Sequence, residues 1–347
     1  MEANDLKQEL LQLLDSLPHH EHGQWIERAL TAIVRVAASE SDRLDWKILL
    51  GTLTDIEKAF KIFHPYRHIR KITIFGSARI SSDRPEYQLA ADFARRITEL
   101  GFMVLTGAGG GIMQAGNEGA GRDRSFGLNI NLPFEQQTNE FIAADPKLIS
   151  FRYFFTRKLF FLRESDAIAL FPGGFGTQDE AFETLTLCQT GKYGPAPLVL
   201  IDRPGGDYWQ EWDDNLYRHL VRRGLINPED RKLYTITDNL SVACNTITNF
   251  YRVYHSSRYV GRLFVMRLNL ELSDETVETL NQDFSDLLLE GRLEKSKAFS
   301  EEIGDETEKL PRLVFYLNQK AQGRLYELIN KINQLVVFSQ EEHPERK

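Results

Sequence analysis

Residues 166–189 read DAIALFPGGFGTQDEAFETLTLCQ, and this stretch decides the fold class. An apolar run at 166–171 is followed by a turn rich in glycine and then by a helical pattern at 177–189. This order predicts a buried strand, a tight turn and a helix.

The same order of strand and helix recurs through the middle of the chain. We predict helices such as 86–100 and 177–189 between strands at 71–75, 102–106, 125–131, 166–171 and 197–201. Alternation of this kind indicates a parallel sheet covered by helices on both faces. The sequence therefore predicts an α/β fold with a Rossmann-like domain over residues 66–258.

The regions on either side of this domain have different patterns. Apolar residues at helical spacing predict three helices in an N-terminal extension over 1–65, which ends at His64-Pro65 because proline disfavours helical geometry in the residue before it. After residue 259 we predict a strand, a helix opened by Ser273, two strands and a helix, at 262–268, 273 onward, 295–300, 312–317 and 323–335. This βαββα order predicts a small α+β domain over 259–340, of a kind used for dimerisation or effector binding.

Composition and charge exclude several classes of protein. A formal net charge of −8 over 347 residues argues against general binding to nucleic acid, although local cations can still hold one phosphate. Cys188 and Cys244 lack the spacing of a zinc site or a disulfide framework. The first residues lack a signal sequence, and no apolar run reaches the ~18 residues of a membrane span. We expect a cytoplasmic protein that binds a small molecule, with no metal and no membrane contact.

Glycine-bearing turns follow three of the predicted strands, at 75–77, 106–111 and 171–177. In open parallel sheets, ligands bind beyond the carboxyl ends of the strands. A glycine turn lets backbone N–H groups approach a phosphate, and the next helix adds its dipole. One glycine pair is more often a simple tight turn, but three aligned turns favour a phosphate site. The predicted binding residues are Ser77, Gly107, Gly109, Gly173, Gly174, Phe175, Gly176 and Thr177.

The better-known nucleotide fingerprints do not fit these loops. Ile112 stands where G-x-G-x-x-G needs glycine, and no GK[ST] follows Gly173, so a dinucleotide-dependent dehydrogenase and a P-loop NTPase are disfavoured. Two polar pairs lie nearby: Arg157-Lys158 at the start of a predicted helix, and Asp179-Glu180 in the first turn after Gly176. Each pair alone has an ordinary structural interpretation. Arg157-Lys158 would be a solvated basic pair, and Asp179-Glu180 would cap the helix. Their combination with the glycine turns makes them candidates for the site.

Four motifs, in order, resemble the LOG (Lonely Guy) family over about residues 70–251. They are FGSAR at 75–79, TGAGGGIM at 106–113, YFFTRK at 153–158 and PGGFGTQDE at 172–180. Phe154-Phe155 and the stretch 129–135 resemble the longer bacterial branch of that family. Ala108, Gly110, Gln114 and Phe155 depart from residues common in the family, but the departures leave the polar pairs intact.

The resemblance implies a phosphoribohydrolase that releases free base and ribose 5-phosphate from cytokinin nucleotides or from AMP. It implies Arg157 and Glu180 as the catalytic pair, with Lys158, Asp179 and residues 173–177 on the substrate. It also implies a homodimer with the site close to the subunit contact. No cofactor is expected. In glycosidic chemistry, the Glu180 carboxylate would stabilise charge at C1′ or activate water, while Arg157 would orient the ribose or phosphate.

Two alternatives stay open at this point. A nucleotide-binding sensor without catalysis would use the same glycine turns. Amino-acid decarboxylation, a label often given to this family, would need pyridoxal phosphate on a lysine, and Lys158 sits in an Arg-Lys pair with nothing else to support such a pocket.

Overall fold

The computed structural model describes residues 3–131 and 137–342, so 132–135 of the stretch that resembles the longer branch lie outside the described residues. The chain divides into two compact units, Met1–Thr54 and Asp55–Lys347. The boundary falls inside helix α3 (Arg43–Phe63) rather than at residue 65. The division into three domains remains a prediction.

The N-terminal extension is helical, as predicted. It holds α1 (Ala3–Ser16), α2 (Gly23–Ala37) and the first part of α3. A short turn, η2 (His64–Tyr66), follows α3 at the predicted proline break. None of the helices among the described residues combines the length and apolar character that a membrane crossing requires.

A seven-stranded sheet forms the core of the second unit, in the order β4-β3-β2-β1-β5-β6-β7, and every neighbouring pair is parallel. The strands are β1 (Lys71–Phe75), β2 (Met103–Thr106), β3 (Ser125–Ile130), β4 (Leu148–Phe151), β5 (Ala167–Leu170), β6 (Leu198–Ile201) and β7 (Tyr234–Thr237). All five predicted strands are confirmed. The sequence missed the two edge strands, β4 and β7, because they are short and only partly buried.

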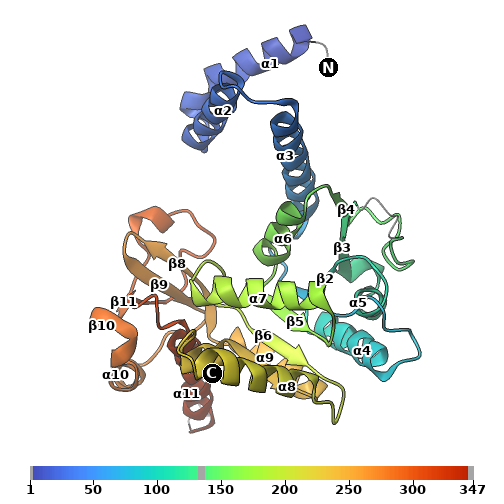
Figure 1. The fold of residues 1–347 in the computed structure, drawn as a ribbon. Helices are drawn as coiled ribbons and strands as arrows, with labels where there is room; N and C mark the ends of the chain where they lie inside the picture. Colours follow the sequence, from blue (N-terminus) through green and yellow to red (C-terminus); the bar gives the residue numbers. More distant parts are fainter. Residues whose placement is uncertain (1–2, 132–136, 343–347) are drawn as a thin grey trace. The chain divides into compact units, whose positions relative to one another are not determined.

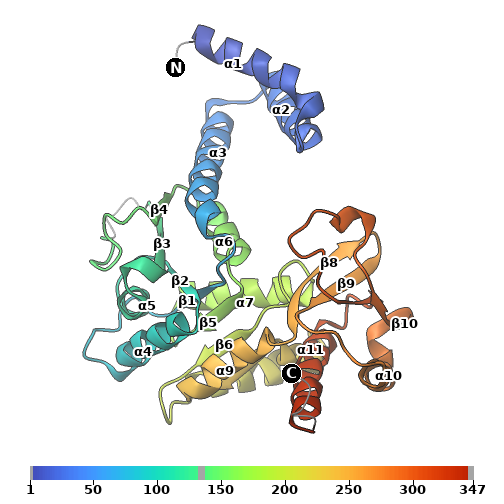
Figure 2. The same cartoon turned by 180° about the vertical axis from the view of Figure 1, so that it is seen from behind.

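Helices cover both faces of this sheet (Figures 1 and 2), which confirms the predicted fold class. One face packs against α4 (Pro85–Glu99), α5 (Ile112–Ala120) and α9 (Leu240–Phe250). The other packs against α6 (Phe154–Arg163), α7 (Phe175–Gln189), α8 (Tyr208–Leu216) and the end of α3. Side chains alternate along each strand, so Ile72 and Ile74 enter the first core and Phe75 enters the second. Short helical turns complete the unit at Arg122–Arg124, Tyr217–Val221 and Pro228–Leu233.

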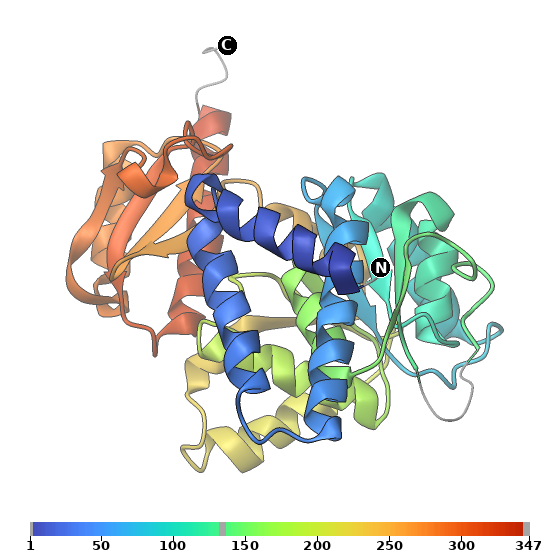
Figure 3. The ribbon, with the colours of Figure 1, turned by 90° about the horizontal axis from the view of Figure 1, so that it is seen from above.

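The C-terminal region is an antiparallel sheet backed by helices, and Figure 3 shows its orange strands beside the red helix α11. Its elements are β8 (Tyr254–Val260), β9 (Leu263–Leu268), α10 (Asp274–Asp283), β10 (Leu288–Ser296), β11 (Arg312–Leu317) and α11 (Gln322–Glu342). Short turns lie at Ser285–Leu287 and Ser300–Glu302. The Ser273 hydroxyl caps α10 as predicted, accepting from the Thr276 amide at 3.1 Å.

Two predictions for this region need correction. The predicted order βαββα lacks β8, so the observed order is ββαββα. The strand predicted at 295–300 instead spans Leu288–Ser296. Both strands carry many half-exposed or exposed polar residues, so neither forms the apolar run on which the sequence prediction depended.

Candidate active site

A cavity of about 850 Å³ opens at the carboxyl ends of the central strands. Its walls come from the loops after β1, β2 and β5 and from helix α6. Because β1 lies between β2 and β5, the strand order reverses at this point, where open α/β sheets bind ligands. The loops after β1 and β5 are joined directly, since the Ser77 amide donates to the Pro172 carbonyl at 3.1 Å.

The loop at 173–177 forms the start of helix α7. The helix begins at Phe175 with Gly174 as its cap, and no side chain caps it. A Cβ at Gly174 or Gly176 would meet nothing within 4 Å, whereas Gly173 packs tightly against Thr177. The first N–H groups of a helix have no partner within it and favour an anion. This end of α7, on the cavity wall, is therefore suited to hold a phosphate.

A chain of side-chain hydrogen bonds holds this loop in place. Tyr208 Oη donates to the Gly173 carbonyl at 2.6 Å, and Gln178 Nε2 donates to Tyr208 Oη at 2.6 Å. Trp212 Nε1 in turn donates to Gln178 Oε1 at 2.7 Å. Sequence reasoning missed Gln178 and Tyr208, because no local pattern indicates that α8 supports the loop.

The loop after β2 is built differently and is buried. Ala108 has a φ of 61°, and its amide donates to Thr106 Oγ1 at 3.0 Å. Asn139 Nδ2 donates to the Gly109 carbonyl at 3.0 Å and to Asn117 Oδ1 at 2.9 Å. Gly109, a predicted binding residue, thus lies in this supporting network and does not line the cavity.

Gly107 does line the cavity, and it leaves room for Arg157. A Cβ at Gly107 would lie 2.4 Å from Nη2 of Arg157. The guanidinium is also fixed by Nε, which donates to the Leu128 carbonyl at 2.8 Å, and by the Phe161 ring, whose centroid lies 5.1 Å away. Burial lowers the pKa of Arg157 to about 10, although Glu180 opposes the shift. Arg157 is therefore a positioned cation at neutral pH.

The segment at the start of helix α6, which carries Arg157, is held in place by a residue of α3. One carboxylate oxygen of Asp55 accepts from the Arg152 amide at 2.9 Å, the Tyr153 amide at 3.3 Å and the Thr156 hydroxyl at 2.8 Å. Asp55 is 3% exposed. No local pattern indicates this role, because Asp55 is nearly a hundred residues away from the helix start that it binds.

Glu180 and Arg157 line the same cavity. Burial raises its pKa, while Lys158 and Arg157 oppose the shift. Because α7 begins two residues before the predicted start at 177, Asp179 and Glu180 lie in its second turn, not in the first. Interaction with the helix dipole therefore does not explain why two acidic residues lie at these positions. The interpretation of the pair as a helix cap is wrong.

Lys158 is engaged by acidic side chains of α7. Its Nζ lies 2.8 Å from Asp179, 3.2 Å from Glu180 and 2.5 Å from Glu183. Burial disfavours the charged form, but Asp179 and Glu183 outweigh it and raise the pKa of Lys158. Of the predicted site, the structure brings together at the cavity Ser77, Gly107, Arg157, Gly173, Gly174, Phe175, Gly176, Thr177, Asp179 and Glu180, whereas Lys158 and Gly109 lie off its wall.

The structure also shows where possible metal ligands and the two cysteines lie. Within residues 3–131 and 137–342, no group of three or more His, Cys, Asp or Glu side chains is placed to hold a metal ion. Cys188 and Cys244 are both buried, and burial raises the pKa of Cys188 to about 11.

Comparison with known families agrees with the motifs in the sequence. Residues 110–247 match the family described as "Possible lysine decarboxylase", which is the LOG family. This match and the motifs in the sequence support assignment of the segment to the LOG family. The segment runs from the second glycine loop through α9 and includes Arg157, Glu180 and the start of α7. A LOG-family assignment suggests chemistry of the nucleotide phosphoribohydrolase type.

Comparison with individual proteins adds little to this. The search of curated proteins finds no match. A molybdenum cofactor binding protein from Rippkaea orientalis is 17% identical with a TM-score of 0.39, covering 52% of this chain and 96% of its own. The molybdenum cofactor carrier protein of Chlamydomonas reinhardtii is 18% identical with a TM-score of 0.36, and the match covers 52% of this chain and 97% of that protein. DNA processing protein A of Helicobacter pylori is 18% identical with a TM-score of 0.36, and the match covers 52% of this chain and 80% of that protein. Similarities of this size do not bear on what the chain does.

Proposed function

We propose that this protein hydrolyses the N-glycosidic bond of a nucleoside 5′-monophosphate, AMP or a cytokinin-type nucleotide, and releases free base and ribose 5-phosphate. One observation carries the proposal: the uncapped start of α7, the Arg157 guanidinium and the Glu180 carboxylate line a single cavity. A phosphate held at the helix start would leave the sugar beside the other two groups.

The start of α7 would hold the 5′-phosphate. Its free N–H groups and the positive end of the helix dipole both favour a dianion. Ser77 adds a hydroxyl beside them, with Oγ held by the Arg79 amide at 3.1 Å. Because Gly174 and Gly176 have open space where a side chain would be, the phosphate can reach the backbone directly.

Glu180 would act at the anomeric carbon. As the bond to the base breaks, C1′ gains oxocarbenium character, and a carboxylate stabilises that charge or takes a proton from the attacking water. Burial raises the pKa of Glu180, which makes it a better proton acceptor than an exposed glutamate. The adjacent Lys158 opposes this rise, because its positive charge favours the ionised carboxylate.

Arg157 would orient the substrate and stabilise charge on the departing base. Its guanidinium donates in fixed directions, and Leu128 and Phe161 hold it in one position. A donor fixed in advance stabilises a developing charge without reorganising during the reaction.

The base would meet aromatic side chains at the mouth of the cavity. Phe154 and Phe175 line it and are 55% and 97% exposed. Exposed apolar side chains continue along α6 and α7 at Phe155, Leu159 and Phe182. A surface of this kind beside the site supports a homodimer, in which the second subunit would cover these side chains.

Decarboxylation receives no support from this geometry. A lysine must lose its proton to form a Schiff base, and Asp179 and Glu183 hold the pKa of Lys158 above its ordinary value. The residues around Lys158 thus do not fit a pyridoxal phosphate site.

The test is incubation of the full chain with AMP, GMP, CMP, UMP and isopentenyl-AMP, followed by chromatography. We expect free base and an equal amount of ribose 5-phosphate from at least one of these nucleotides. Intact nucleotide together with measurable binding would instead favour a sensor without catalysis.

A further inference from the structure

A second cavity, of about 820 Å³, lies at the opposite edge of the parallel sheet. It is bounded by the segments that lead into β1, β5 and β6, by the start of β8, and by the loop around Glu306. These are the amino ends of the strands, so the cavity is separated from the candidate active site by the length of the sheet.

Cations outnumber carboxylates on the walls of this cavity. Its charged residues are Arg67, Arg70, Arg163 and Lys192 against Asp166 and Glu306. The Lys192 ammonium has no carboxylate within 4.0 Å among the residues that the structure describes. A local excess of positive charge stands out in a chain whose formal net charge is −8, and it attracts anions.

Part of this positive charge is compensated, since Arg163 is paired with Glu164. Asp166 is bound to Arg70, with 2.8 Å between Oδ1 and Nη1. Glu306 is shared, lying 4.0 Å from Arg67 and 3.1 Å from His68, and its side chain is 71% exposed. An anion that enters the cavity would therefore compete with one exposed carboxylate and would meet Lys192 without competition.

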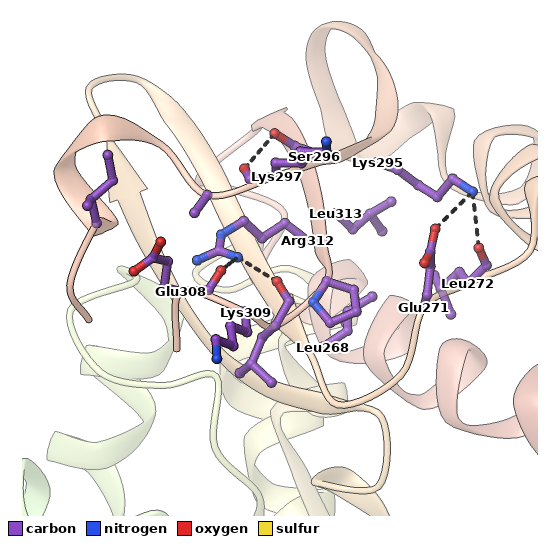
Figure 4. A pocket seen from close by; sticks show the side chains of 14 residues that line it. Leu268, Glu271, Leu272, Lys295, Ser296, Lys297, Glu308, Lys309, Arg312 and Leu313 are labelled. Atoms are coloured by element: carbon purple, nitrogen blue, oxygen red, sulfur yellow. Dashed lines mark hydrogen bonds and ion pairs between the residues drawn. The ribbon is translucent and has the colours of Figure 1, made fainter. Parts of the chain in front are cut away.

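The loop that carries Glu306 is held in place by hydrogen bonds from Arg312. The buried Arg312 donates to the backbone carbonyls of Thr307, Glu308 and Leu310, and Figure 4 shows it reaching into this loop. Its Nε also donates to Glu302 at 2.8 Å. In the pocket drawn in Figure 4, Arg312 is engaged in this way and Lys295 is paired with Glu271 and Asp274.

Both helices that carry the candidate catalytic residues lead from one cavity to the other. Helix α6 has Arg157 in its first turn and ends at Arg163, which lines the second cavity. Helix α7 has Glu180 in its second turn and ends at Gln189, two residues before Gly191 and three before Lys192. A ligand in the second cavity would therefore lie at the far ends of both helices that carry the candidate catalytic side chains.

We propose that this second cavity binds a small molecule with two or more negative charges, and that its binding changes the activity at the opposite edge of the sheet. The ligand is a phosphorylated or polycarboxylate metabolite, since guanidinium and ammonium groups recognise both kinds of anion. The volume is in the range of about 300–1,000 Å³ that pockets for such molecules occupy.

The first test is hydrogen–deuterium exchange of the full chain with pyrophosphate or with citrate. We expect slower exchange at 189–196 and 251–257. Protection by pyrophosphate alone assigns the site to phosphates, and protection by citrate alone assigns it to carboxylates. Protection confined to 173–180, or none at all, would overturn the proposal. This readout does not depend on whether the protein hydrolyses nucleotides.

The second test reverses charge on the cavity wall. The double variant Arg67→Glu/Lys192→Glu should bind the protective anion about tenfold more weakly or worse by calorimetry. The control, Arg222→Glu/Arg223→Glu, makes the same change in charge at exposed positions away from the cavity and should bind as the wild type does. If the double variant fails to fold, Lys192→Gln alone should still weaken binding severalfold. Equal binding by the cavity variants and the control would contradict the assignment.

The coupling between the cavities has its own readout. The protective anion should change the rate of base release from AMP at least twofold in the wild type and leave the rate of the double variant unchanged. Binding with no change in rate would refute the coupling.

Discussion

Two glycine loops lie at the same edge of the sheet, yet they are built for different tasks. The loop at 106–111 is buried and held by Thr106, Asn117 and Asn139, and its Gly107 makes room for the Arg157 guanidinium. The loop at 173–177 is open, and its Gly174 and Gly176 face empty space at the uncapped start of α7. The first loop places a side chain of another element, and the second offers its own backbone to a ligand.

The difference shows why a glycine motif does not by itself identify a binding loop. Glycine is required at 107 and at 173 because another atom of the protein lies too close for a Cβ. At 174 and 176 no such atom is near, so the space left by the missing side chain is available to a substrate. Only the surroundings of each glycine separate the two cases.

The largest expected effect comes from removing the charge of Glu180, on the helix that the open loop begins. Glu180→Gln should lower kcat for base release about 1,000-fold, because general base and electrostatic roles are of this order. Asp179→Asn is the matched control, since Asp179 is the next residue on α7 and pairs with the same lysine. We expect it to retain kcat within about tenfold. Similar losses of kcat in both variants would show that Glu180 has no catalytic role beyond that of the neighbouring carboxylate.

A methyl group in the buried loop should have the next largest effect. Gly107→Ala places a Cβ 2.4 Å from Arg157 Nη2, so the guanidinium must move. Kinetics should show a loss of about 100-fold in kcat, the usual result of misplacing a catalytic group by about 1 Å. Gly176→Ala, where the Cβ meets nothing within 4 Å, serves as the control and should act mainly on KM. The comparison between the loops fails if the two variants behave alike.

The network under the buried loop should contribute to stability. Asn117 is fully buried, and its side chain accepts from Thr106 and Asn139 and donates to the Phe126 carbonyl. Asn117→Ala leaves these groups unpaired, so denaturant titration should show a loss of about 2 kcal/mol in unfolding free energy. Gln178→Ala, which breaks the partly exposed network under the open loop, should cost about 1 kcal/mol or less. A larger loss of unfolding free energy in Gln178→Ala than in Asn117→Ala would contradict this prediction. It would mean that the network under the open loop contributes more to stability than the network under the buried loop.

The smallest effect concerns the pH profile. Lys158 lowers the pKa of Glu180 against the larger effect of burial, which raises it. In Lys158→Met the pKa of Glu180 should rise further, so the carboxylate is protonated at a higher pH. The acidic limb of log(kcat/KM) should therefore move to higher pH, with little loss at the optimum. A limb that stays in place or moves to lower pH would show that Glu180 is not the titrating group.

Much of the core could be predicted from the sequence because its strands are continuous apolar runs. β1 and β11 were predicted to the residue, but β4, β7, β8 and β10 carry too much polar or exposed surface to give that signal. The start of α7 was placed two residues late, because Phe175 and Gly176 read as part of the turn.

Within the candidate site, the sequence could indicate which groups matter but not what holds them. Glycine turns and polar pairs were visible as local patterns and led to the cavity residues. Asp55, Asn139 and Tyr208 act across long sequence separations, on α6, on the buried loop and on the open loop. Nothing in the residues beside them distinguishes them from ordinary polar side chains.

The most direct measurement is a crystal structure of the Glu180→Gln variant with AMP bound. The 5′-phosphate should accept hydrogen bonds from the backbone at 175–177, with C1′ beside the carboxamide of residue 180 and with Arg157 over the ribose or the base. A phosphate seated in the loop at 106–111, or a glycosidic bond directed away from residues 157 and 180, would contradict the account.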